Sequence, residues 1–192
     1  MKTIAIVATG GTIAGTGKKG KTAAYHAGEI DIDSIIETIP EINEVAHIKE
    51  YQLMNIDSNE MTHEKWLILK NNIEEILSDD TIDGAVVTHG TDTLDETAYF
   101  LTLTLNTPKP VVLTGVMRPA TATSADGPFN LYQAICLACH GESYNRGVLA
   151  LFSNTIYSGR DNLPIILLDS IYQRLLIFIR LKLSLVFFQT FC

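Results

Sequence analysis

The fold is decided near the start of the chain, where residues 3–15 read TIAIVATGGTIAG. Residues 3–8 are a short run of mostly apolar side chains, and Gly10 and Gly11 follow almost at once. Such a run bounded by glycines predicts a buried strand that delivers a loop to one edge of a sheet. Two adjacent glycines let the backbone turn sharply and approach a ligand closely. The next residue, Thr12, is a candidate nucleophile, although a plain strand–helix turn with a capping threonine explains the stretch equally well.

Strand-like and helix-like segments alternate from this point to residue 161. Further strands are predicted at 47–55, 84–88, 110–114 and 146–152, with helices at about 33–39, 62–77, 94–105 and 126–138. Apolar strands that alternate with amphipathic helices predict an α/β fold with three layers, in which helices cover both faces of a mostly parallel sheet. Ligands bind such sheets beyond the carboxyl ends of the strands.

Three loops predicted at those ends are rich in Thr, Ser and Asp: residues 9–15, 57–59 and 89–93. We expect them to converge on a ligand site. His89 lies between a strand and the Gly-Thr-Asp sequence that follows, where we expect it to orient the loop by hydrogen bonds rather than to bind a metal. The five histidines of the chain show no metal-ligand spacing.

Two threonines on different loops, Thr12 and Thr91, each follow a glycine, and Asp92 adjoins the second. This pattern suggests a nucleophilic hydrolase, because a threonine hydroxyl attacks a carbonyl when a neighbouring group takes its proton. Backbone N–H groups beside the glycines are candidates to stabilise the oxyanion. Asp92 and Ser58 are candidates to bind the polar ends of a small zwitterionic substrate.

Composition narrows the class of protein. A chain of 192 residues suits one full domain, and its net charge of −8 argues against binding a nucleic-acid backbone. The N-terminus does not resemble a signal peptide, and the chain has three cysteines, so we expect reduced thiols and a cytoplasmic location.

Two further stretches match a known sequence motif but lack the structural context that the motif requires. Residues 15–22, GTGKKGKT, fit the phosphate-loop pattern, yet the preceding strand ends near Ala8 and residues 23–28 open a helix poorly. A solvated loop is favoured there, and a nucleotide-binding domain is the remote alternative. Residues 136–140, CLACH, fit the c-type haem attachment pattern, but they continue an apolar helix face and we expect neither haem nor zinc.

Two segments carry a specific resemblance. Residues 8–14, ATGGTIA, and 84–94, GAVVTHGTDTL, resemble the signature segments of bacterial type II L-asparaginases. Supporting matches lie at 115–119, 124–132 and 145–149, and the similarity runs in order from about Lys2 to Asp161. Several long matches in the same order argue against a chance origin.

The resemblance implies an L-asparagine amidohydrolase with the fold of the family's N-terminal domain and no metal or cofactor. Thr12 would attack the side-chain amide carbon, forming an acyl-enzyme and releasing ammonia. Tyr25, in a loop that closes as a lid, would assist proton transfer at Thr12. Thr91 would help activation and the hydrolytic water, and Asp92 would act beside it.

The resemblance also implies how the substrate is held. Ser58 would bind the α-carboxylate, and Asp92, helped by Asn59, would bind the α-ammonium group. Many members have Gln where this chain has Asn59, which is shorter by one methylene and weakens that contact. One methylene in a pocket discriminates only modestly, so L-glutamine is a possible second substrate.

The chain departs from the family after Asp161. A family lysine that activates the threonine is replaced by Pro164, and losing such an activator lowers the rate strongly. Residues 162–192 contain no Gly, Ala or Glu, and the family's second, smaller α/β domain is missing. We therefore expect a catalytic domain at 1–161, and an apolar tail at 162–192 produced by a shifted reading frame or an early stop.

Two consequences follow from that expectation. The family's homo-oligomer is doubtful here, because the missing domain helps to form it. The alternative to an impaired enzyme is a non-catalytic remnant that still binds aspartate or asparagine through Ser58, Asn59 and Asp92.

Overall fold

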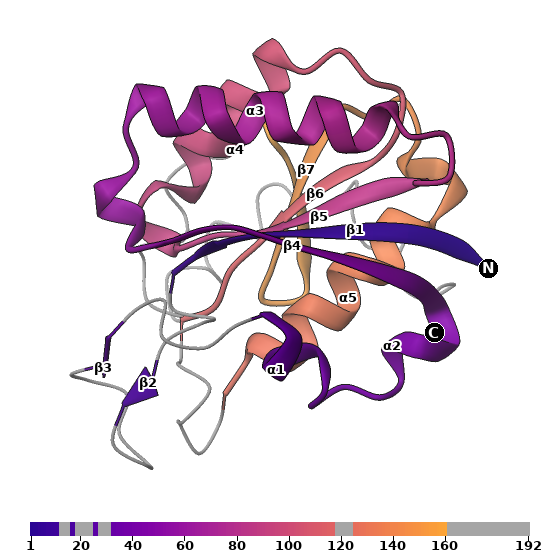
Figure 1. Cartoon of the computed structure of the whole chain (residues 1–192), viewed down its shortest axis with the longest axis horizontal. Helices are drawn as coiled ribbons and strands as arrows, with labels where there is room; N and C mark the ends of the chain where they lie inside the picture. Colours follow the sequence, from indigo (N-terminus) through magenta and orange to yellow (C-terminus); the bar gives the residue numbers. More distant parts are fainter. Residues whose placement is uncertain (12–15, 18–24, 27–31, 118–124, 161–192) are drawn as a thin grey trace, which may run out of the picture.

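Strand β1 (Lys2–Gly10) lies inside a six-stranded sheet of order β4-β1-β5-β6-β7-β8 (Figure 1). The structure, a computed structural model, describes residues 1–11, 16–17, 25–26, 32–117 and 125–160. The first five strands of this order are parallel, and β8 runs antiparallel to β7. The remaining strands of the sheet are β4 (Ala46–Ile56), β5 (Gly84–Thr88), β6 (Val111–Thr114), β7 (Val148–Phe152) and β8 (Thr155–Ser158).

Helices cover both faces of the sheet, as the sequence predicts (Figure 1). One face carries α3 (His63–Ser78) and α4 (Leu94–Thr104). The other carries α1 (Ile32–Ile36), α2 (Ile42–Val45) and α5 (Gly127–Cys139). Short 3-10 turns complete the chain: η2 (Ser58–Glu60), η3 (Thr91–Thr93) and η4 (Gly141–Ser143). The predicted three-layer α/β architecture is confirmed.

The side chains of β1 point alternately into the two hydrophobic cores of the molecule. Ile4 and Ile6 pack on the face of α5, whereas Ala5 and Val7 pack on the face of α3 and α4, and all four are fully buried. Successive side chains of a strand point to opposite faces, so a strand flanked by two helix layers must be apolar throughout. This explains why the apolar run at 3–8 shows no alternation.

Local signals place the helices. The Thr62 hydroxyl accepts a hydrogen bond from the Lys65 N–H at 3.4 Å, which caps α3 where the sequence predicts its start. Helix α5 begins directly after Asp126 and has a proline in its first turn. Both helices therefore begin where the sequence predicts.

The sheet extends one strand beyond its predicted end at residue 152. Ser153 and Asn154 have φ angles of 47° and 64°, and they form the two-residue turn of a hairpin in which Phe152 pairs with Thr155. Two consecutive positive φ angles match the right-handed twist of the flanking strands. The Gln133 Nε2 group donates a hydrogen bond to Asn154 Oδ1 and ties this turn to α5.

Two predicted features fall largely outside the described residues: the phosphate-loop match at 15–22 and the apolar tail at 162–192. Within the first lies β2 (Thr16–Gly17), which pairs antiparallel with β3 (Tyr25–His26). Within the described ranges, none of the helices has the length and apolar character needed to cross a membrane.

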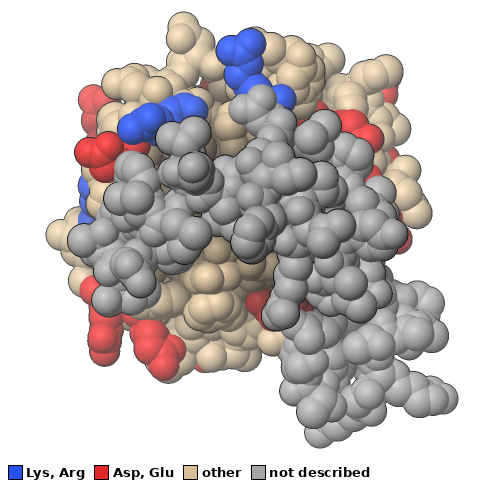
Figure 2. Space-filling model, turned by 180° about the vertical axis from the view of Figure 1, so that it is seen from behind, with Lys and Arg blue, Asp and Glu red and all other residues tan. Residues whose placement is uncertain are grey.

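The surface agrees with the acidic composition. Figure 2 shows acidic side chains spread around the margin of one face, with Lys and Arg side chains toward its upper part. The Lys and Arg side chains visible in this view do not form one continuous basic area.

Candidate functional site

Three loops meet at the carboxyl ends of β1, β4 and β5 and pack closely against one another. A Cβ atom added to Gly11 would lie 2.5 Å from the Gly90 N atom, and one added to Gly90 would lie 2.5 Å from Ser58 Oγ. Gly11 also has a φ of +78°, which side chains rarely adopt, and its N–H donates to the Ile56 carbonyl at 2.9 Å. The predicted convergence is confirmed, and glycine is required where the loops touch.

Ser58 joins the second loop to the third. Its Oγ accepts a hydrogen bond from the Asp92 N–H at 3.2 Å, and its carbonyl accepts one from Thr93 Oγ1 at 2.8 Å. The Ser58 side chain is buried, with 3% exposed. Because its oxygen already accepts the Asp92 N–H, the hydroxyl hydrogen is available to donate to a ligand carboxylate.

The other predicted substrate contacts lie at the surface of the same edge. The side chains of Asp92 and Asn59 are exposed, and Thr91 is half-buried. Asp92 therefore offers a carboxylate to a cationic group next to the Ser58 hydroxyl. Thr12 lies outside the described residues, directly after Gly11. Tyr25 lies in β3, and its side chain is outside what the structure describes.

His89 orients the third loop, as the sequence predicts. Its ring is fully buried, with Nδ1 2.7 Å from the Gly90 carbonyl and Nε2 3.0 Å from Thr97 Oγ1. The Trp66 indole N–H donates to the same Thr97 oxygen at 2.8 Å. The sequence predicts the helices that carry Trp66 and Thr97, at 62–77 and 94–105, but not the contact between these two residues. The available signal for this contact was a side chain with a polar atom, Trp66 or Thr97, on the buried side of each helix.

Burial also controls the charge of this histidine. Desolvation lowers the pKa of His89 to about 4, and the hydrogen bond to the Gly90 carbonyl only partly opposes the shift. The ring is therefore neutral at physiological pH. A neutral imidazole has one donor nitrogen and one acceptor nitrogen, which suits a carbonyl on one side and a hydroxyl on the other.

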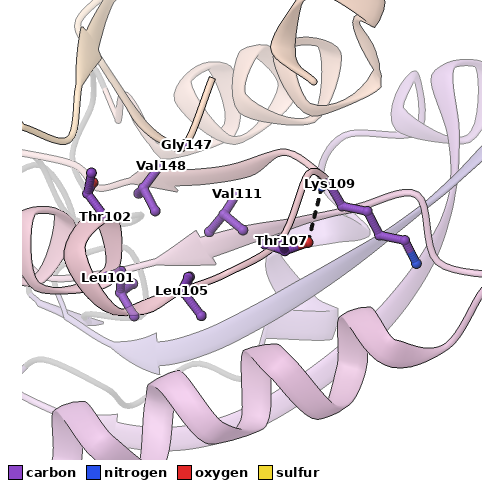
Figure 3. Close-up of a pocket in the computed structure, with 8 residues that line it drawn as sticks. All are labelled: Leu101, Thr102, Leu105, Thr107, Lys109, Val111, Gly147 and Val148. Carbon is purple, nitrogen blue, oxygen red and sulfur yellow. Dashed lines mark hydrogen bonds between the residues drawn. The ribbon is translucent and has the colours of Figure 1, made fainter. Parts of the chain in front are cut away.

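A small cavity lies elsewhere, below the C-terminal half of α4 (Figure 3). Leu101 of α4 and Leu105, which directly follows α4, face Val111 and Val148, and the volume is about 20 Å³. That volume holds about one water molecule. The Lys109 side chain points away from the other lining residues, and a space of this volume is too small for a substrate.

The edge suits the chemistry of a small polar molecule. It combines a buried serine, an exposed carboxylate and closely packed loop backbones. Within the described part of the chain, no group of three His, Cys, Asp or Glu side chains is arranged to hold a metal ion. The acyl-transfer chemistry suggested by the sequence would depend on side-chain hydroxyls and backbone N–H groups.

Comparison with known proteins gives consistent results. Residues 3–162 match the family model described as "Asparaginase, N-terminal". The chain is 50% identical over 158 residues to the probable periplasmic L-asparaginase of Haemophilus influenzae, covering 82% of this chain and 45% of that relative. It is 43% identical over 159 residues to the glutaminase-asparaginase of Acinetobacter glutaminasificans, covering 82% and 48% respectively.

A solved structure agrees with these relatives. The crystal structure of the probable cytoplasmic L-asparaginase from Campylobacter jejuni superposes with a TM-score of 0.81 at 50% sequence identity. The match covers 83% of this chain and 49% of that one. The chain thus spans about half the length of the relatives that it matches. The family model matches residues 3–162, a range that includes the glycine-lined strand ends. The chain therefore belongs to the asparaginase family.

Proposed function

We propose that this chain carries the threonine nucleophile and the substrate-binding loops of an L-asparagine amidohydrolase. The observation that carries the proposal is the contact among Gly11, Ser58 and Gly90, which brings the loop before Thr12 onto the loops that hold Ser58 and Asp92. Family membership supports the same chemistry.

The α-amino-acid end of asparagine would bind at Ser58 and Asp92. The Ser58 hydroxyl donates to the α-carboxylate, because its acceptor side is occupied by the Asp92 N–H. The exposed Asp92 carboxylate pairs with the α-ammonium group, and Asn59 lies on the same turn as Ser58. This end of the substrate then fixes the side-chain amide toward Thr12.

The reaction takes two steps at the side-chain amide carbon. The Thr12 oxygen bonds to that carbon, the C–N bond breaks, and the hydroxyl proton leaves with the nitrogen as ammonia, with Tyr25 assisting the transfer. A water oxygen, positioned with the help of Thr91, then bonds to the same carbon. The ester bond breaks, a water proton returns to Thr12, and aspartate is released.

Ammonia release from L-asparagine by the purified 192-residue chain tests the proposal. We expect release by the wild type, loss of it in Thr12→Ala, and partial retention in Thr12→Ser, which keeps a hydroxyl. Equal release by the wild type and Thr12→Ala would overturn the proposed nucleophile.

Ser58 has a matched control elsewhere in the fold. Ser58→Ala is expected to raise KM by about tenfold, because a hydrogen bond to a charged carboxylate is lost. Ser143 is equally buried, with 3% exposed, and its Oγ donates to the Leu137 carbonyl at 2.6 Å far from the site. Ser143→Ala should leave KM unchanged, so a similar rise in both variants would argue against substrate contact at Ser58.

The alternative function is binding without turnover. Pro164 replaces the lysine that activates the threonine in the family, and this favours a chain that binds aspartate or asparagine but releases no ammonia. Thermal stabilisation by L-aspartate that disappears in Ser58→Ala, in a chain without ammonia release, would support this alternative over the enzyme.

Substrate range and location extend the proposal. L-glutamine is a second candidate substrate, because the Acinetobacter glutaminasificans relative is named a glutaminase-asparaginase. A cytoplasmic location is supported by the Campylobacter jejuni relative, which is named a probable cytoplasmic enzyme, whereas the Haemophilus influenzae relative is named periplasmic at equal identity. Cell fractionation separates the two locations, and sizing of the purified chain tests self-association.

A further inference from the structure

A continuous chain of hydrogen bonds runs from the outer helix layer to the third loop of the site. It begins at Trp66 on α3, passes through Thr97 on α4, and reaches the Gly90 carbonyl through both nitrogens of His89. The three donor–acceptor distances are 2.8, 3.0 and 2.7 Å. Thr97 and His89 are fully buried, so solvent does not compete for these bonds.

The chemistry of the partners assigns every hydrogen in the chain. The indole N–H of Trp66 only donates, so Thr97 Oγ1 must accept from it. The Gly90 carbonyl only accepts, so His89 Nδ1 carries the hydrogen. His89 Nε2 is then an acceptor. Because the Thr97 oxygen accepts the Trp66 N–H, its own hydroxyl hydrogen is available to donate to His89 Nε2.

This arrangement fixes the orientation of one peptide group at the site. In a trans peptide the C=O and the following N–H point in opposite directions. Holding the Gly90 carbonyl inward against His89 therefore turns the Thr91 N–H away from the protein interior. Among the described residues, the Thr91 N–H has no acceptor, as expected for the first residue of a short helix.

We propose that His89 is a positioning residue, locked as the Nδ1–H tautomer by Thr97 and Trp66, that holds the Gly90–Thr91 peptide with its N–H facing the substrate. The proposal rests on the proposed function, since it names the group that orients a backbone donor at the same site. The loop is held on its other side by the Asp92 N–H bond to Ser58 Oγ. Two independent attachments thus fix one short segment.

Packing around the hydrogen bonds keeps them in place. Trp66 stacks on Phe100 of α4, with ring centroids 5.4 Å apart and planes inclined by 16°. A Cβ atom added to Gly115 would lie 2.7 Å from the His89 carbonyl, so the backbone just after β6 packs closely against the backbone of His89. The network therefore has little freedom to rearrange. Loss of the Thr97 hydroxyl should alter the position of His89 and, with it, the hydrogen bond to the Gly90 carbonyl.

The first test is nitrogen NMR of the full chain with ¹⁵N-labelled histidine. We expect His89 to show a protonated Nδ1 and an unprotonated Nε2 at pH 7. Thr97→Ser, which keeps the hydroxyl, should preserve this signature and the Thr91 amide resonance. Thr97→Val has a similar shape but no hydroxyl, and it should shift both. A protonated Nε2 in the wild type, or an unmoved Thr91 amide in Thr97→Val, would overturn the proposal.

The second test uses two replacements of similar size at His89. Asn can donate to the Gly90 carbonyl from nearly the same place as Nδ1, whereas Leu cannot donate at all. In the ammonia assay we expect His89→Leu to lower kcat by about a hundredfold with KM changed by less than about threefold, the range seen when a backbone donor to a developing oxyanion is lost. His89→Asn should recover at least about tenfold of that loss. Equal kcat values for the two variants, both folded, would overturn the positioning role.

The two proposals fail in different ways. If the wild-type chain releases no ammonia, the proposed enzyme fails, and the NMR signature of His89 and Thr91 still decides the positioning. If ammonia is released but Thr97→Val leaves the Thr91 resonance unmoved, the positioning fails and the enzyme stands.

Discussion

The two ends of the parallel strands treat polar groups differently. At the carboxyl ends, loops pack closely against one another, and the polar side chains of Ser58, His89 and Thr97 are buried and hydrogen-bonded within the protein. At the amino ends, polar contacts such as that of Lys49 with Asp79 lie at the surface, where water competes.

The difference shows which end of the strands is more sensitive to substitution. A buried polar group that loses its partner stays unsatisfied, whereas an exposed one rebinds water. The carboxyl-end edge should therefore respond strongly to small substitutions, and the amino-end edge weakly. Single substitutions at the two edges test that contrast.

Gly11→Ala should be the most damaging single-methyl change. The new Cβ would lie 2.5 Å from the Gly90 N atom, and φ at this position is +78°. Overpacking and a positive φ together are expected to lower the free energy of unfolding by about 4 kcal/mol. Urea unfolding measures the loss.

Gly147→Ala separates the two contributions to that loss. Gly147 has a φ of +71° and nothing within 4 Å of an added Cβ, so only backbone strain applies, about 1 kcal/mol. Gly141→Ala, with open space and no positive φ, should change little. Equal losses at Gly11 and Gly147 would show that the loop contact contributes nothing.

The buried histidine predicts a pH dependence. The pKa of His89 is lowered to about 4 by burial, below the 6.5 of the unfolded chain, so the unfolded state binds more protons between these values. The stability supplied by the neutral ring is thus complete above pH 6.5 and falls as the pH drops, by about 3 kcal/mol at pH 4. Urea unfolding at several pH values follows the loss.

A second group opposes this trend and requires a control. Burial, followed by a hydrogen bond with Asp33 and the charges of Asp33 and Glu37, raises the pKa of Glu50 to about 7. Protonation of Glu50 therefore favours the folded state as the pH falls from 7 toward 4.5. His89→Asn removes only the histidine contribution, so the wild-type curve minus the variant curve should retain the acid-side loss. Parallel curves would contradict the assignment.

Much of the site at the carboxyl ends of the strands could be predicted from the sequence, because the residues at strand ends form local patterns. The glycines at 10–11 and 90 and the hydroxyl-rich loops predicted which segments meet, and the structure confirms their contact. Hydrogen-bond partners far apart in the chain left no such signal. Thr97 lies eight residues from His89, across the turn from β5 into α4, and Trp66 lies 31 residues from Thr97 and meets it through the packing of α3 on α4.

The missed strand β8 has a local cause. Its hairpin depends on Ser153 and Asn154 both adopting positive φ angles, and neither is the glycine that usually marks such a turn. The contact between Gln133 and Asn154 ties the turn to α5, and no pattern in either segment predicts that contact. Tertiary packing thus selects a turn that the local sequence only permits.

Asp83→Ala tests an intermediate case at the amino ends. The Asp83 carboxylate accepts the Thr3 N–H at 2.8 Å, and the Asp83 N–H donates to the Thr3 carbonyl at 2.8 Å, joining the starts of β1 and β5. The carboxylate is half-buried, so water can replace it in part, and we expect a loss of about 1 kcal/mol in urea unfolding. Asp83→Asn keeps an acceptor oxygen and should lose less. A loss as large as that of Gly11→Ala would erase the contrast between the two ends.

Lys49→Met should have the smallest effect. The Lys49–Asp79 pair is 3.2 Å apart, with side chains 43% and 44% exposed, and we expect Tm to change by about 1 °C or less. The pKa of Asp79 is lowered to about 2 chiefly by hydrogen bonds from the Thr81 hydroxyl and N–H, and only then by Lys49. An NMR titration should therefore find the pKa of Asp79 still low in Lys49→Met but raised in Thr81→Val. The reverse result would mean that the ion pair, rather than the local turn, organises this edge, and that exposed charges matter at the amino ends after all.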